Sequence, residues 1–188
     1  MNTQLIREDL EKGLIGPRIL LSGVRLMDET SRDSSEYTDR QNYPFWYHLG
    51  KQMGLKKRAF QVGPGLGLVP YCLLQCSPVS EWTCFGGNEA FVTKNIKQRS
   101  PHTRVSFHKQ LEVRPPDYDL ALLTQEYDYD NAKKFLEFLW IGLESGGLLA
   151  VDYIDNDAQG EAFRDFCRVK NRESVNFKTR YGVGLIER

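Results

Sequence analysis

The chain has 188 residues, a length typical of one domain, so we expect no separate cofactor and substrate domains. Hydrophobic residues make up 40% and charged residues 27% of the chain, which indicates a folded globular protein rather than a disordered one. Lys plus Arg and Asp plus Glu number 25 each, so the formal net charge is zero. With no overall field to attract a polyanion, we expect neither a nucleic acid nor a membrane as partner.

The sequence predicts a cytoplasmic protein with free thiols. No apolar run approaches the roughly 20 residues that a membrane-spanning helix needs, and the first 13 residues lack the apolar stretch of a signal peptide. The cysteines have no zinc-type CxxC pairing, and Cys72 and Cys76 are four residues apart in an apolar helical pattern. We therefore expect buried free thiols rather than a disulfide or a zinc site.

Residues 1–58 precede the regular pattern of the chain. A capped helix is expected to begin near Asn2 or Thr3, and an aromatic segment follows at residues 43–50. We expect residues 1–58 to form an N-terminal helical arm or lid, and residues 59–188 to form the main domain.

From residue 59 onward, short apolar strands alternate with helical patterns. Strands are predicted at residues 59–62, 82–85, 105–107, 120–123 and 148–151. Helices are predicted from the glycine loop to residue 74 and at residues 88–99, 131–143 and 157–170. This alternation predicts an α/β fold with a mostly parallel sheet and helices on its faces. Two further strands, at residues 175–179 and 183–186, are expected to close the sheet as an antiparallel hairpin.

A glycine-rich loop follows the first predicted strand. Gly63, Gly65 and Gly67 lie between that strand and an apolar helix, an arrangement that lets a ligand approach backbone amides closely. The dinucleotide-binding fingerprint needs a small residue where this chain has Leu68. That departure, and the lack of a substrate domain, count against an NAD-linked oxidoreductase.

Four motifs in order resemble those of the class I S-adenosylmethionine-dependent methyltransferases. They are QVGPGLG at residues 61–67, YDLALL at 118–123, LESGGLLAVD at 143–152 and YGVGLI at 181–186. The resemblance covers residues 57–188. It implies a three-layer Rossmann-like fold with a seven-stranded sheet, parallel except for an antiparallel C-terminal strand. It also implies S-adenosylmethionine as cofactor, bound by Gln61, Gly63, Gly65 and Gly67.

The chain departs from the family pattern at two acidic positions. The family has Asp or Glu where this chain has Gln61, and it ends the second strand in an acid that binds the cofactor ribose. In this chain Asn88 or Glu89 could bind the ribose hydroxyls instead, or no side chain binds them. Equally, Asn88 could cap the following helix, and the negative charge of Glu89 could interact favourably with the N-terminal end of the helix dipole. These departures leave open a second reading, a non-catalytic binding or assembly protein with the methyltransferase fold.

The loops after the fourth and fifth predicted strands contain candidate metal ligands. A subgroup of the family has Asp, Asp and His where this chain has Thr124, Glu126 and Tyr127. Several acids could still supply oxygen ligands to a hard cation, or they could be ordinary solvated loop residues. They are Glu126, Asp128, Asp130, Asp152, Asp155 and Asp157. We predict no metal site.

Methyl transfer requires a positioned acceptor and, for some acceptors, a base. His48 is one candidate base if the aromatic segment lies over the sheet edge as a lid. Alternatively, Phe45, Trp46 and Leu49 form a buried stripe and His48 faces solvent. The other two histidines, His102 and His108, flank the third predicted strand and are expected at the surface.

Asp152 is the second catalytic candidate. The glycines at 146–147 set the start of the fifth strand, so Asp152 is expected at its carboxyl tip, facing the acceptor. Alternatively, it binds the backbone near Tyr153. The sequence favours a small-molecule acceptor, because no basic groove or aromatic stacking platform for RNA stands out.

Overall fold

The computed structural model describes residues 43–52, 58–76, 78–111, 116–179 and 181–188. The helix predicted near Asn2 lies outside these residues. Within them the strands are β1 (Arg58–Val62), β2 (Glu81–Phe85), β3 (Arg104–His108), β4 (Tyr118–Leu123), β5 (Leu143–Asp152), β6 (Val175–Phe177) and β7 (Val183–Glu187). The helices are α3 (Tyr43–Gln52), α4 (Leu68–Leu73), α5 (Glu89–Arg99), α6 (Tyr129–Gly142) and α7 (Asp157–Lys170). None of these helices is long and apolar enough to cross a membrane.

The strands form one seven-stranded sheet in the order β3-β2-β1-β4-β5-β7-β6. Strands β1 to β5 pair in parallel, whereas β7 runs antiparallel to both β5 and β6. The predicted sheet, with its antiparallel C-terminal strand, is confirmed. The strand order reverses between β1 and β4, and ligands of open α/β sheets bind at such a reversal.

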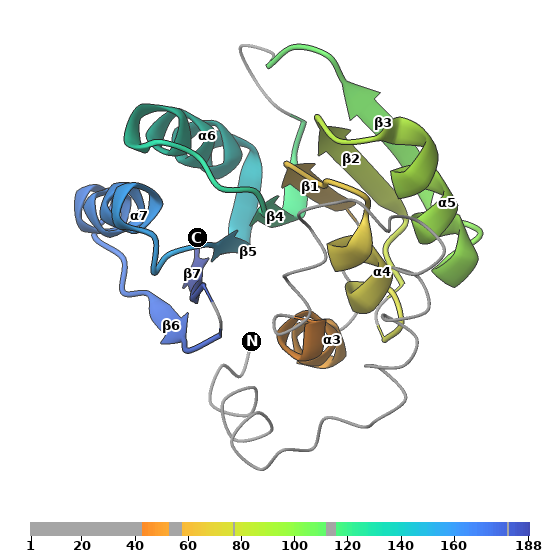
Figure 1. Cartoon of the computed structure of the whole chain (residues 1–188), viewed down its shortest axis with the longest axis horizontal. Coiled ribbons are helices and arrows are strands. Elements are labelled where there is room, and N and C mark those ends of the chain that lie inside the picture. The colour runs from red at the N-terminus through yellow and green to blue at the C-terminus, as the bar shows by residue number, and fades with distance from the viewer. Residues whose placement is uncertain (1–42, 53–57, 77, 112–115, 180) are drawn as a thin grey trace.

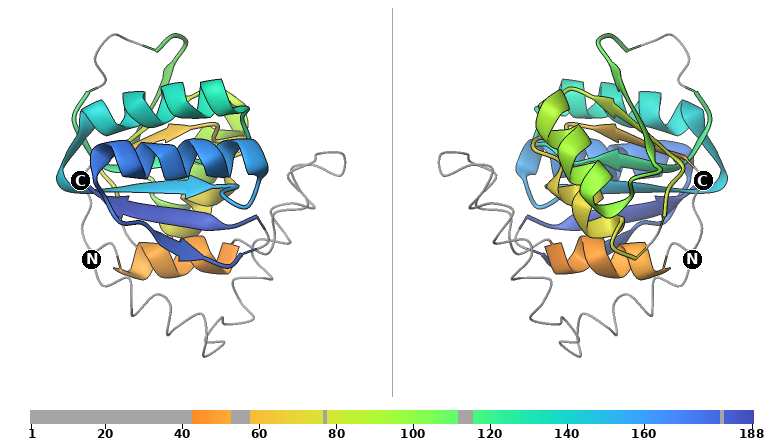
Figure 2. Two further views of the ribbon diagram at one scale, coloured as in Figure 1. Left: turned by 90° about the vertical axis from the view of Figure 1, so that its left-hand side faces the viewer. Right: turned by 90° about the vertical axis from the view of Figure 1, so that its right-hand side faces the viewer.

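Helices cover both faces of the sheet, which gives three layers (Figures 1 and 2). Alternate strand residues point to opposite faces. Trp82, Leu120 and Ala150 belong to the core cluster shared with α3, α4 and α5. Phe60, Ala121 and Leu149 belong to the cluster under α6 and α7. The glycine loop and the strand ends are therefore held between two separate cores.

Helix α3 is part of the first core. Phe45 and Leu49 have no exposed surface and Trp46 has 1%, and the rings of Phe45 and Phe177 lie 5.1 Å apart. The buried stripe of Phe45, Trp46 and Leu49 that the sequence offered as an alternative is therefore present, and these three side chains are part of the core. The backbone of His48 lies in α3, but its side chain is outside the part that the structure describes.

Strand β5 begins earlier than its sequence suggests, at Leu143 instead of Leu148. Tyr118 of β4 pairs with Leu143, but Leu120 pairs with Leu148, so β5 carries extra residues in an irregular stretch. The backbone bulges at Gly146, whose φ is +74°, and the last residue of the chain bonds to this stretch: Gly146 N donates to Arg188 O, and Arg188 N donates to Gly147 O. The two glycines thus lie inside the strand rather than before it.

Candidate functional site at the carboxyl edge of the sheet

Five loops meet at one edge of the sheet. Strands β1, β2, β4 and β5 are parallel, so the loops that follow them leave from the same edge. Asp152 at the end of β5 pairs with Val183 at the start of antiparallel β7, so the turn before β7 lies there too. This is the edge at which α/β proteins bind ligands.

The glycine loop is a tight turn, as predicted. Gly63, Gly65 and Gly67 have φ of +71°, +52° and +83°, and Gly67 N donates to Pro64 O at 2.7 Å. Side chains other than glycine adopt this backbone conformation only at a cost. Space is also limiting, since a Cβ on Gly67 would lie 2.8 Å from the Cα of Val92 on α5.

Neighbouring elements fix the carbonyl groups of this loop. Thr124 Oγ1 donates to Gly63 O at 2.8 Å, and the buried Asn95 donates through Nδ2 to Leu66 O at 2.6 Å. Asn88 N donates to Gly65 O at 3.0 Å. The N–H of Gly65, by contrast, has no hydrogen-bond acceptor in the described part of the chain. The loop is rigidly held and keeps a donor available for a ligand.

Gln61 supports the glycine loop from within the core. The side chain has no exposed surface. Its Oε1 accepts from Trp82 Nε1 at 3.1 Å, and its Nε2 donates to Thr124 Oγ1 at 2.7 Å. Thr124 in turn donates to Gly63 O, so these hydrogen bonds link Gln61 to the glycine loop. A carboxylate at this position could accept from Trp82 but could not donate to Thr124, so the amide suits this network.

The loop after β2 is built around a helix cap. Asn88 is the N-cap of α5, and its Oδ1 accepts from Phe91 N at 3.2 Å. Glu89 is exposed in the first turn of the helix. Of the alternatives raised by the sequence, capping is the one that the geometry displays. A Cβ on Gly87 would lie 2.5 Å from Pro64 Cγ, so this loop packs directly on the glycine loop.

Gln125 and Tyr127 cover the first glycine of the loop. A Cβ built on Gly63 would lie 2.4 Å from Gln125 Cβ, and 3.1 Å from both Gln125 Oε1 and Tyr127 Oη. Tyr127 is fixed by its N–H, which donates to Gln159 Oε1 at 2.7 Å, and by its ring, 4.7 Å from that of Phe135. Burial raises the pKa of Tyr127 to about 12, so both oxygens above Gly63 are uncharged at neutral pH.

Sequence reasoning missed this pair because it sought charged metal ligands in the loop after β4. Neutral Gln and Tyr side chains carry no such signal. Their closeness to Gly63 depends on the pairing of β1 with β4, which joins segments about 60 residues apart.

Asp152 ends β5, as predicted, and is 2% exposed. Its Oδ1 accepts from Tyr153 N at 2.9 Å, which is the backbone contact foreseen as the alternative role. Its carbonyl accepts from Gln159 Nε2 at 2.7 Å. Because Gln159 also accepts from Tyr127 N, one buried amide joins the loops after β4 and β5.

Several acids of these loops have structural partners. Asp128 caps α6 by accepting from Asn131 N at 2.9 Å, and this hydrogen bond lowers the pKa of Asp128. Glu126 accepts from Asn156 Nδ2, and the carboxylate of Asp155 packs against Gly182. Among the described residues, no three His, Cys, Asp or Glu side chains are grouped closely enough to hold a metal ion.

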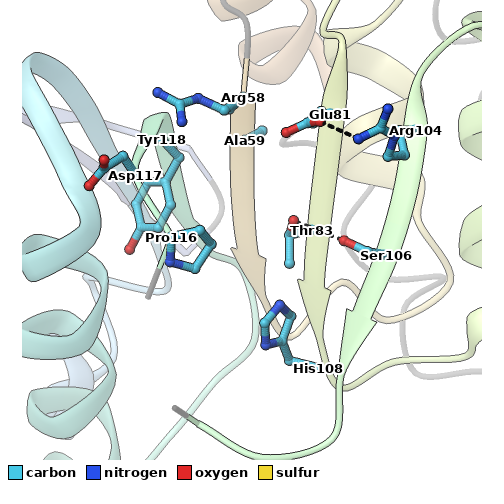
Figure 3. Close-up of a pocket in the computed structure, with 10 residues that line it drawn as sticks. All are labelled: Arg58, Ala59, Glu81, Thr83, Arg104, Ser106, His108, Pro116, Asp117 and Tyr118. Carbon is cyan, nitrogen blue, oxygen red and sulfur yellow. Dashed lines mark hydrogen bonds and ion pairs between the residues drawn. The ribbon is translucent and has the colours of Figure 1, made fainter. Parts of the chain in front are cut away.

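A separate hollow of about 530 Å³ lies on the sheet face formed by β1, β2 and β3 (Figure 3). Glu81 and Arg104, the first residues of β2 and β3, form an ion pair at one end of it, at 2.9 Å. His108, predicted at the surface, is instead half-buried here, with its ring 5.7 Å from that of Phe60. The hollow includes neither the glycine loop nor Asp152, so it is distinct from the carboxyl edge.

Solved structures of methyltransferases share this architecture. PaMTH1 of Podospora anserina, with S-adenosylhomocysteine (SAH) bound, has a TM-score of 0.63 at 12% identity and covers 100% of this chain and 96% of its own. The O-methyltransferase TomG of Streptomyces achromogenes, with S-adenosylmethionine, has a TM-score of 0.63 at 11% identity and covers 100% and 98%.

The O-methyltransferase of Bacillus cereus, with SAH, has a TM-score of 0.62 at 13% identity and covers 99% of this chain and 98% of its own. The chain has the methyltransferase fold. At these identities the likeness extends to the fold alone. No protein-family model matches the sequence, and no curated protein matches it.

Proposed function

We propose that this protein binds S-adenosylmethionine at the carboxyl edge of the sheet and transfers its methyl group to a small-molecule acceptor. The observation that carries the proposal is the glycine loop: three glycines at positive φ, carbonyls fixed by Thr124 and Asn95, and the N–H of Gly65, which has no acceptor among the residues that the structure describes. Similar folds have been solved with S-adenosylmethionine or SAH bound. When bound, this cofactor supplies a methyl group activated by a sulfonium.

The amino-acid end of the cofactor is placed at Gly63 in this proposal. Gln125 Oε1 and Tyr127 Oη both lie 3.1 Å from a Cβ built on this glycine, and both can accept hydrogen bonds from an ammonium group. The backbone of Gly63, Gly65 and Gly67 forms the cradle, that is, the part of the glycine loop that would hold the cofactor. Gln61 acts indirectly, by holding the loop through Thr124.

Asn88 and Glu89 are proposed for the ribose. The cap bond occupies Asn88 Oδ1 but leaves its Nδ2 as a donor, and the carboxylate of Glu89 is exposed beside it. Either group can bind a hydroxyl. Because neither is the acid at the strand end that the family uses, we expect weaker binding of the ribose than in a methyltransferase that has this acid.

Asp152 is the proposed base on the acceptor side. In the transfer, the acceptor atom bonds to the methyl carbon while the carbon–sulfur bond breaks, and the electron pair stays on sulfur. The proton of the acceptor passes to Asp152 and then to water. His48 stays a second prediction for this role, which the activity of a His48→Ala variant would test.

The decisive experiment is calorimetry with three ligands: S-adenosylmethionine, SAH and 5′-methylthioadenosine, which lacks the amino-acid end. We expect Gln125→Ala and Tyr127→Phe to weaken the first two ligands and to leave methylthioadenosine unchanged. Gly65→Val should abolish binding of all three, because a side chain would fill the cradle. Tyr129→Phe serves as a matched control, since the Tyr129 hydroxyl bonds to Asp165 of α7 instead of lying over Gly63.

A second candidate function is ligand binding without turnover. It is favoured by the tight cover of Gln125 over Gly63 and by the missing acids at two family positions. Binding of the cofactor without methylation of any acceptor in a broad small-molecule panel would support it. Absence of heat with all three ligands at millimolar concentration would contradict both functions.

A further inference from the structure

Strand β3 forms one edge of the sheet and pairs only with β2. In a parallel pair, every second residue turns its N–H and C=O toward the neighbouring strand. Because Arg104 N donates to the carbonyl group just before β2 at 2.8 Å, those residues are Arg104, Ser106 and His108. The N–H and C=O groups of Val105 and Phe107 therefore point away from β2, and they have no hydrogen-bond partner in the described part of the chain. The edge offers four backbone groups to another strand.

The side chains of β3 give the edge two different faces. Those of Arg104, Ser106 and His108 line the hollow on one face of the sheet (Figure 3). Those of Val105 and Phe107 lie on the other face, half-buried against the core cluster shared with α3, α4 and α5. A strand added beside β3 would therefore place alternate side chains over the hollow and beside the apolar pair.

The segment around β3 is basic, although the formal net charge of the whole chain is zero. Residues 90–111 include no Asp or Glu, and their basic residues are Lys94, Lys97, Arg99, Arg104 and Lys109. Of these, only Arg104 forms an ion pair with a carboxylate among the described residues, and its side chain is still 80% exposed. Lys97 Nζ donates to Thr103 O just before β3, and the exposed Lys109 directly follows the strand. Both ends of the edge therefore carry positive charge.

We propose that β3 is a docking edge for another protein, which adds an extended segment with alternating acidic and apolar side chains as an eighth strand. The acidic side chains face Arg104 and His108, and the apolar ones pack beside Val105 and Phe107. Hydrogen bonds to the four open backbone groups hold the segment in register.

Charge selects this partner over a second copy of the chain. Two copies joined through β3 would bring two basic strands together, and like charges on neighbouring strands are destabilising. A nucleic acid would match the charge, but it has no alternating apolar side chains to place beside Val105 and Phe107. The docking edge includes neither the glycine loop nor Asp152, so the proposal does not depend on binding of S-adenosylmethionine.

The test uses fluorescein-labelled peptides and the full chain, with binding measured by fluorescence anisotropy. The probe is DVEIDVE, in which acids and apolar residues alternate. One control peptide, DDEEVVI, has the same composition with the acids grouped, and a second, KVKIKVK, has the opposite charge. Val105→Pro removes an outward N–H, which an edge strand tolerates, and Val105→Thr is its matched control. Lys109→Glu reverses a charge at the docking edge, and Lys178→Glu does so beside β6 at the opposite edge of the sheet.

We expect the alternating peptide to bind at least about ten-fold more tightly than either control peptide. Val105→Pro should weaken it by about ten-fold and Lys109→Glu by about three- to ten-fold, whereas Val105→Thr and Lys178→Glu should stay within about two-fold of the wild type. Hydrogen exchange of the wild type supplies a readout that does not require a folded variant. The peptide should slow exchange of the Val105 and Phe107 amides and leave that of Ser106, already bonded to β2, unchanged.

Equal binding of the grouped peptide would reduce the docking edge to a charged surface and overturn the proposal. So would unchanged exchange at Val105 and Phe107 with the peptide in excess. Tighter binding of oligothymidylate than of the alternating peptide would assign the basic segment to a nucleic acid instead. Slower exchange at these two amides on raising the protein concentration alone would assign the edge to a second copy.

Discussion

Gly67 and Gly86 adopt the same left-handed backbone, with φ of +83° and +82°, in different surroundings. A Cβ on Gly67 would meet the backbone of Val92 at 2.8 Å, whereas one on Gly86 would meet nothing within 4 Å. Gly86→Ala should therefore cost only the conformational strain, about 1 kcal/mol, and Gly67→Ala should cost about 2 kcal/mol or more. Urea unfolding of both variants measures the difference. Equal losses of unfolding free energy in the two variants would mean that α5 shifts away from the new Cβ at no energetic cost.

Asp152 combines a structural bond with its proposed chemical role, and two substitutions separate them. Asparagine retains an oxygen that accepts from Tyr153 N, so Asp152→Asn should keep the melting temperature and lose methyl transfer. Alanine removes the acceptor and should cost about 1–2 kcal/mol as well. Thermal unfolding and a methylation assay check both. Full activity in Asp152→Asn would exclude the carboxylate as base.

At this scale the sequence predicted residues whose role follows from local order. Glycines between a strand and a helix must turn, and Asp152 closes an apolar strand run. The partners of Gln61 were not predictable, because Trp82 and Thr124 are 21 and 63 residues away and meet it only through sheet pairing. The stacked rings of Tyr153 and Tyr181 likewise meet only through the pairing of β5 with β7.

Helix α3 is part of the core, so truncating its buried Trp46 should destabilise the protein. Trp46 is 1% exposed, and Trp46→Ala should lower the free energy of unfolding by about 3–5 kcal/mol. Val169 on α7 is 71% exposed, and Val169→Ala should change it by less than about 0.5 kcal/mol. Chemical denaturation compares the two. A loss below about 1 kcal/mol for Trp46→Ala would restore the reading of this segment as a lid.

Elements with clear apolar periods and end signals were predicted closely. The sequence places α7 at residues 157–170, as observed, and Asn88 caps α5 as its position suggests. The start of β5 was missed because its first residues, including two glycines, have weak strand propensity. They join the sheet through hydrogen bonds to Arg188, which no local pattern reveals.

At the scale of the whole molecule, buried groups should make the fold sensitive to alkali. Burial raises the pKa of Cys72 from 9.0 to about 12 and also raises that of Tyr118. Between these values the unfolded chain has released protons that the folded chain retains. The free energy of unfolding is thus unaffected below about pH 9 and falls as the pH rises toward 12, by at most about 1.4 kcal/mol per pH unit for each group.

Urea unfolding between pH 8 and 11 measures this decline. Cys72→Ala and Tyr118→Phe remove one titrating group each. The free energy of unfolding of each variant should therefore fall less steeply with pH than that of the wild type, even though it is lower at pH 8. The comparison is between slopes, because each substitution also removes packing or the bond from Tyr118 Oη to Leu139 O. Slopes identical to that of the wild type would show that other groups control the alkaline transition.

The hollow on the face of β1 to β3 also bears on what the fold can accommodate. Thr83 and Ser106 hydrogen-bond to one another there at 3.0 Å, so covering them would leave neither hydroxyl without a partner. The glycine loop and Asp152 lie elsewhere, at the carboxyl edge. An extra helix inserted between β3 and β4 can therefore settle over these hydroxyls, provided that it leaves the Glu81–Arg104 ion pair exposed, because burying those charges would be costly. The fold has a place for growth, or for an engineered fusion, that does not disturb its ligand site.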